Sequence, residues 1–82
     1  MTNPPARQKL EINNDTKRKL EVYVEVVPDI YLLEPGDRMV IEADLAGAPF
    51  TVNVLSDGRL QVYPGDDCDP PVTINGELAQ LL

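Results

Sequence analysis

The chain has 82 residues, and its 7 Lys and Arg against 14 Asp and Glu give a formal net charge of −7, which predicts one small acidic domain. This charge repels a phosphate backbone and an anionic membrane surface alike, so we expect no nucleic acid and no membrane partner. With one cysteine, no apolar run long enough to cross a bilayer and no signal-peptide pattern at its start, the protein is expected to be cytoplasmic.

Residues 1–7 include two adjacent prolines and are expected to form a flexible tail, which leaves 8–82 as a single β domain. Charged and aliphatic residues alternate over 9–12 and predict a first strand, and the polar run 13–18 predicts a hairpin loop after it. The second strand, which Pro28 ends, is the clearest in the chain. Its two faces are Leu20, Val22, Val24 and Val26 on one side, and Glu21, Tyr23 and Glu25 on the other.

The turn residues Pro35-Gly36 separate two strand-like segments, 29–33 and 38–45, and predict another hairpin. Segments 50–55 and 59–63 alternate in the same way, with Asp57-Gly58 expected as a two-residue type I′ turn between them. Segment 72–74 completes the pattern. Segment 77–82 suits either a strand or a short helix, and its leucine spacing slightly favours the helix.

About six or seven short strands result, separated by most of the 8 prolines and 5 glycines. Alternating strands bury one face and need a second layer over it, so we expect an all-β fold, either a small antiparallel β-sandwich or a partly open barrel. The predicted core consists of Leu20, Val22, Val24, Met39, Ile41, Phe50, Val52, Val54, Leu60 and Val62.

The absence of histidine removes the usual general base, the Ser–His and Cys–His pairs and most imidazole metal sites. Cys68 lies among three aspartates whose charges disfavour its thiolate, and their spacing matches no calcium loop. A hydrolase would need a carboxylate pair with one raised pKa, and most acids here fall in turns or on solvent faces. We therefore predict no enzyme activity and no catalytic, cofactor-binding or metal-binding residues.

The outer face of the second strand is the one candidate surface, because Tyr23 projects there between Glu21 and Glu25. If 50–55 and 59–63 join the same sheet, then Asn53, Gln61 and Tyr63 can share this face. A tyrosine among polar groups can anchor a protein or stack on a ligand, although ordinary cross-strand packing is the more common role of a tyrosine on a half-exposed sheet. The interaction candidates are Tyr23, Glu25 and Tyr63.

Between Leu20 and Gly76, a set of turn and core residues forms a recognisable outline. It consists of Val22-Tyr23-Val24-Glu25, Pro28, Tyr31, Leu33, Pro35-Gly36-Asp37, Phe50, Asp57-Gly58 and Gly76. The set resembles a group of small uncharacterised bacterial proteins with a Tyr-x-Leu-x-Pro-Gly-acidic turn. This resemblance implies a bacterial β domain of unknown function and carries no active site.

The sequence thus predicts a non-enzymatic module for protein–protein interaction, or an accessory subunit, without a cofactor. Contact through an edge strand, with a second copy in a homodimer or with another protein, is expected because edge strands present unpaired backbone groups. The alternative is a module that binds a small ligand, a sugar or a cation, on the exposed sheet face bearing Tyr23 and Tyr63.

Overall fold

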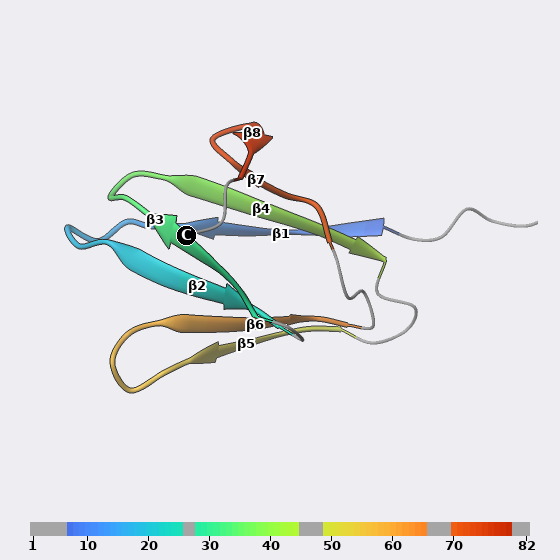
Figure 1. Cartoon of the computed structure of the whole chain (residues 1–82), viewed down its shortest axis with the longest axis horizontal. Coiled ribbons are helices and arrows are strands. Elements are labelled where there is room, and N and C mark those ends of the chain that lie inside the picture. The colour runs from blue at the N-terminus through green and yellow to red at the C-terminus, as the bar shows by residue number, and fades with distance from the viewer. Residues whose placement is uncertain (1–6, 26–27, 45–48, 66–69, 80–82) are drawn as a thin grey trace, which may run out of the picture.

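The computed structural model describes residues 7–25, 28–44, 49–65 and 70–79, which form eight strands and no helix (Figure 1). The first sheet has the order β1-β4-β7-β8, with β1 Arg7–Asn13, β4 Arg38–Asp44, β7 Val72–Ile74 and β8 Glu77–Leu78. The second has the order β3-β2-β6-β5, with β3 Asp29–Leu33, β2 Leu20–Val24, β6 Leu60–Pro64 and β5 Phe50–Val54. The two sheets pack as a small β-sandwich, which confirms the predicted all-β fold.

All neighbouring strands run antiparallel except β2 and β6, which run parallel with Tyr23 beside Gln61. The core lies between the sheets, where alternation brings one face of each strand inward. Its buried apolar residues are Ile12, Val22, Val24, Tyr31, Leu33, Met39, Ile41, Ala43, Val62 and Val72. Five members of the predicted core are thus buried, and Leu20, Phe50 and Leu60 pack partly buried against them.

The placement of Val52 and Val54 in the core is wrong, because these side chains are 42% and 74% exposed. Register gives them the same face as Val62 and Leu60, so their alternation was interpreted correctly. However, β5 is the outermost strand of its sheet, and Figure 1 shows it farthest from the first sheet. The opposite layer therefore leaves these two valines largely uncovered.

Two predicted hairpins are also wrong, because each connects strands of different sheets. Strand β1 pairs with β4, from Arg7 opposite Asp44 to Asn13 opposite Arg38, and not with β2. The Pro35-Gly36 turn likewise leads from β3 in the second sheet to β4 in the first. Alternation determines which face of a strand is buried, but it carries no information about the neighbouring strand.

The buried residue Asn14 joins these two crossovers. Its backbone N–H donates to the carbonyl of Asp37 (3.0 Å), and its carbonyl accepts from the N–H of Gly36 (2.8 Å). Its Nδ2 donates to the carbonyls of Arg18 (2.8 Å) and Leu33 (3.0 Å). Its Oδ1 accepts from the N–H and the hydroxyl of Thr16 (3.1 and 2.6 Å). Every side-chain donor and acceptor site of this amide is therefore used.

The β5–β6 hairpin is confirmed, but its turn is not the predicted two-residue type I′. The N–H of Gly58 donates to Leu55 O (2.9 Å) and that of Leu55 donates to Arg59 O (2.8 Å), which closes a three-residue loop. Within this loop only Gly58 has a positive φ (91°), as in a type I turn followed by a glycine bulge.

A type I′ turn occurs instead at Asn75-Gly76, where φ is 54° and 85°. This turn pairs Glu77 with Ile74, so the backbone of β8 enters the sheet. The preference for a helix at 77–82 is therefore wrong for Glu77 and Leu78, and 80–82 fall outside the described residues. Most of the predicted tail, Val26 and Cys68 with its neighbouring aspartates also fall outside the described residues.

Candidate functional site

The outer face of the second sheet gathers the predicted interaction residues. The parallel register of β2 and β6 sets Tyr23 beside Gln61, and the β5–β6 hairpin sets Asn53 beside Gln61 in turn. Tyr63 follows two residues along β6 and therefore shares this face. The conditional prediction that Asn53, Gln61 and Tyr63 join Tyr23 is confirmed.

Tyr23 is engaged on both its hydroxyl and its ring. The hydroxyl donates to Glu21 Oε2 (3.2 Å) and accepts from Arg59 Nη1 (2.9 Å). The guanidinium carbon of Arg59 lies 5.1 Å from the centre of the ring, within the range of a cation–π contact. A ligand that stacked on this ring would have to displace Arg59.

Arg59 is fixed from its other side by Asp57 in the turn that precedes it. Nε of Arg59 lies 2.6 Å from Asp57 Oδ2, and the backbone N–H of Arg59 donates to Asp57 Oδ1 (3.2 Å). The hydrogen bond to Arg59 lowers the pKa of the Asp57 carboxyl below its ordinary value. The Asp57 carboxylate, followed by the Tyr23 hydroxyl, raises the pKa of Arg59, so Arg59 stays charged.

A second chain of hydrogen bonds crosses the same face. Gln61 Nε2 donates to Glu25 Oε2 (2.8 Å), and Asn53 Nδ2 donates to Gln61 Oε1 (3.2 Å). Tyr63 has no such contact within the described part of the chain and is 39% exposed. Of the three interaction candidates, Tyr23 and Glu25 are therefore bonded within the face, while Tyr63 presents its ring to solvent.

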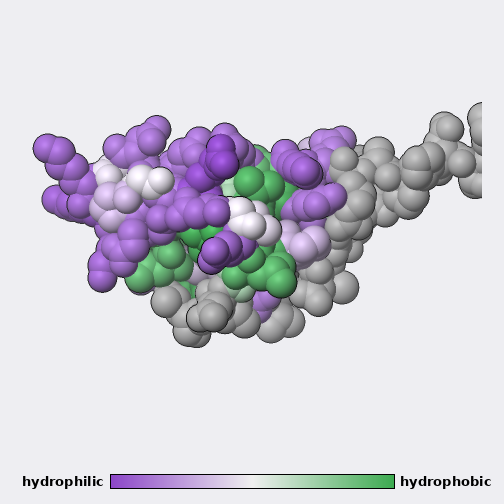
Figure 2. All heavy atoms as spheres, turned by 90° about the horizontal axis from the view of Figure 1, so that it is seen from above, coloured by the Kyte–Doolittle hydropathy of each residue, from purple (hydrophilic) through white to green (hydrophobic). Residues whose placement is uncertain are grey.

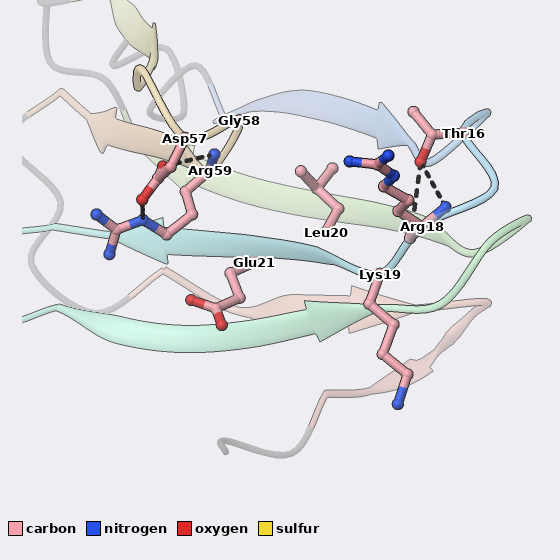
Figure 3. Close-up of a pocket in the computed structure, with 8 residues that line it drawn as sticks. All are labelled: Thr16, Arg18, Lys19, Leu20, Glu21, Asp57, Gly58 and Arg59. Carbon is pink, nitrogen blue, oxygen red and sulfur yellow. Dashed lines mark hydrogen bonds and ion pairs between the residues drawn. The ribbon is translucent and has the colours of Figure 1, made fainter.

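The structure also has a cavity of about 450 Å³ at one end of the sandwich (Figure 3). The β1–β2 crossover and the start of β2 line it with Thr16, Arg18, Lys19, Leu20 and Glu21, and the β5–β6 turn lines it with Asp57, Gly58 and Arg59. The sequence analysis did not single out this group. Its available signal was Lys17-Arg18-Lys19, three consecutive basic residues in an acidic chain.

The outer face of the first sheet is mostly hydrophilic, as Figure 2 shows from that side. Charged pairs such as Arg38 with Glu11, 3.7 Å apart, lie on it. The side chain of Leu78 in the short strand β8 also belongs to this face and is 81% exposed. This face therefore resembles an ordinary solvated sheet surface.

The β5 edge of the second sheet is less typical of a solvated surface. Strand β5 has four consecutive exposed residues, 51–54, and pairs with β6 on one side. Its side chains Val52 and Val54 lie on the face that points toward the first sheet, which leaves them largely uncovered beside the unpaired backbone groups of this edge.

Among the described residues no three His, Cys, Asp or Glu side chains gather in a group that could hold a metal ion. No helix in the part of the chain that the structure describes has the length and apolar character needed to cross a membrane. Comparison of the chain with family models, curated proteins and solved structures gives no match.

Proposed function

We propose that this protein is a non-enzymatic interaction domain that binds an extended segment of a protein partner along the free edge of β5. The observation that carries the proposal is the exposure of residues 51–54 on a strand whose outer edge has no neighbour among the described strands. Main-chain hydrogen bonds to such an edge give affinity, and alternate side chains give selectivity.

The other three edges are better protected against strand addition. Strand β1 carries the charged residues Lys9 and Glu11, and β8 has only two residues. Strand β3 begins with Asp29, and its five side chains are buried or half-buried. Strand β5, with the sequence Phe-Thr-Val-Asn-Val, has neither a charge nor a proline, the devices that usually block edge pairing.

The two exposed valines give a partner an energetic reason to bind. Full burial of a valine side chain contributes about 1.5–3 kcal/mol, and Val54, at 74% exposed, has most of this still to gain. A partner strand with apolar side chains at alternate positions would cover Val52 and Val54 while it pairs with the β5 backbone.

The non-enzymatic part of the proposal is supported by the chain's chemistry. The sequence has no histidine, and the polar side chains on the outer face of the second sheet are bonded to one another, Tyr23 to Arg59 and Glu25 to Gln61. These bonds also favour a protein partner at the edge over a sugar or cation on the sheet face, because such a ligand would have to replace them.

The test compares Val54→Lys with Leu78→Lys, which also introduces a lysine in place of an exposed aliphatic side chain but does so on the other sheet. Sedimentation velocity at micromolar concentration measures self-association, and crosslinking followed by affinity capture measures other partners. We expect Val54→Lys to lose the complex and Leu78→Lys to keep it. A strictly monomeric parent chain without a partner, or an equal loss in both variants, would contradict the proposal.

A further inference from the structure

The cavity at the end of the sandwich has the size of a small-ligand site. Its volume of about 450 Å³ falls within the roughly 300–1,000 Å³ usual for such sites. In Figure 3 the Leu20 side chain lies between Arg18 on one side and the Asp57–Arg59 pair on the other. Leu20 is half-buried, so it offers apolar surface with charged groups on both sides.

The charge of the lining differs in sign from that of the whole protein. Three of the chain's seven basic residues, Arg18, Lys19 and Arg59, line the cavity against two acids, Glu21 and Asp57. The lining is therefore net positive, while the chain carries −7. Since the rest of the chain repels anions, a cationic lining would attract them only at short range.

Most of the charges in the lining already have partners. The Asp57 carboxylate is bound to Arg59 at 2.6 Å, and Glu21 accepts the hydroxyl of Tyr23. Lys19 lies 3.7 Å from Glu34, and Figure 3 shows its ammonium group directed away from Arg18.

Arg18 is different, because its guanidinium has no ion pair within the described part of the chain. The backbone of Arg18 is fixed by Thr16 and Asn14, through bonds at 3.2 Å to its N–H and 2.8 Å to its carbonyl. The residue is thus anchored next to the cavity with its charge and its five N–H donors available.

We infer that this cavity binds a small ligand through an oxyanion, a carboxylate or a phosphate group, with Arg18 as its charge partner. The planar guanidinium matches both groups in bidentate geometry. Leu20 contacts the apolar part of the ligand, and Arg59, held in place by Asp57 and Tyr23, forms the opposite wall. A cation is disfavoured, since both lining carboxylates are already bonded. The inference is independent of the β5 edge.

The experiment titrates the ¹⁵N-labelled chain with sodium phosphate and, separately, with sodium benzoate, at constant ionic strength, and follows amide shifts. Arg18→Gln removes the charge, and Lys9→Gln makes the same change at an exposed position on β1 outside the cavity. Because the hydrogen bonds of Arg18 to the described residues all involve its backbone, both variants should keep the dispersed spectrum of the parent chain.

We expect saturable shifts confined to residues 16–21 and 57–59. Arg18→Gln should weaken binding about tenfold, as expected for a lost hydrogen bond to a charged group, and Lys9→Gln should leave it unchanged. Saturation by phosphate alone would identify a phosphate group, and saturation by benzoate alone a carboxylate with an apolar body. The inference would be overturned by shifts spread over all basic residues, by no saturation with either salt, or by equal weakening in both variants.

Discussion

Replacement of Asn14 by aspartate tests the junction between the two crossovers. The change keeps the size and shape of the side chain but turns its Nδ2 donor into an oxygen. That oxygen would face the carbonyls of Arg18 and Leu33, which now accept from Nδ2 at 2.8 and 3.0 Å. The residue is 1% exposed, so water cannot replace the lost bonds.

The cost follows from these contacts. Each carbonyl left without its donor costs about 1–3 kcal/mol, and a buried carboxylate with an incomplete set of partners costs about 3–5 kcal/mol in all. A domain of this size has a total stability of only about 5–10 kcal/mol, so Asn14→Asp is expected to be close to unfolding at pH 7.

The loss should also depend on pH. Burial and the two carbonyls raise the folded-state pKa of the introduced carboxyl above its unfolded value of about 3.9. The added penalty is therefore absent below pH 4 or so, where the protonated acid can donate to one carbonyl, and it grows as the pH rises through the folded-state pKa. Part of the loss should be recovered at low pH.

Urea denaturation at pH 7 and pH 4 measures this effect. The control is Asn13→Asp, the same change at the adjacent exposed position, where the amide donates to the Glu11 carboxylate at 3.3 Å and to no other described residue. We expect the control to lose no more than about 0.5 kcal/mol. Similar denaturation midpoints for the two variants, or a greater loss for Asn14→Asp at pH 4 than at pH 7, would refute the reasoning.

Two further predictions concern the second sheet. Val24→Asp places a charge at a position that is 4% exposed, so it should lower the free energy of unfolding by several kcal/mol more than Glu25→Lys, which loses mainly the hydrogen bond from Gln61. Equal melting temperatures of the two variants would mean that the faces of β2 are assigned backwards. The pKa of Asp57 should rise toward its ordinary value in Arg59→Gln, as followed by NMR titration of its carboxyl carbon. Because the pKa of Asp57 is lowered in the folded parent chain, the Asp57–Arg59 pair stabilises the fold above the unfolded-state pKa, and this stabilisation is lost as the pH falls through the folded-state pKa. An unchanged titration of Asp57 in the variant would show that Arg59 does not lower its pKa.

Side-chain alternation was sufficient to predict seven of the eight strands and half of the ten buried apolar residues. Met39 and Ile41 are buried because a strand with period two has only two faces, and the apolar one must be inside. The exposure of Val52 and Val54 could not be predicted in this way, since it depends on where β5 lies in the sheet and not on its own sequence. The same limit explains the two wrong hairpins, because residues 13–18 have a polar turn composition that serves a crossover as well as a hairpin.

The candidate surfaces were predictable to the extent that they depend on local pattern. Tyr23 and Glu25 were placed on an outer face correctly, but their bonds to Arg59 and Gln61 join residues 36 positions apart. Those contacts depend on the parallel register of β2 and β6, which no short-range pattern encodes. The cavity depends on the same register, since it brings the start of β2 next to the β5–β6 turn.

The parallel pairing of β2 with β6 has a consequence for how the chain assembles. It joins two hairpins, β2–β3 and β5–β6, over three residue pairs from Val22 opposite Leu60 to Val24 opposite Val62. Each hairpin is local in sequence, but a chain emerging from the ribosome has completed β3 long before β6 exists. Because long-range pairing must overcome loop-closure entropy, we expect the β2–β6 pairing to form late in folding and to open before the two hairpins do. Amide hydrogens of β5 and β6 should then exchange faster than those of β2 and β3, and the β5–β6 hairpin would be the unit of the native fold that detaches most readily.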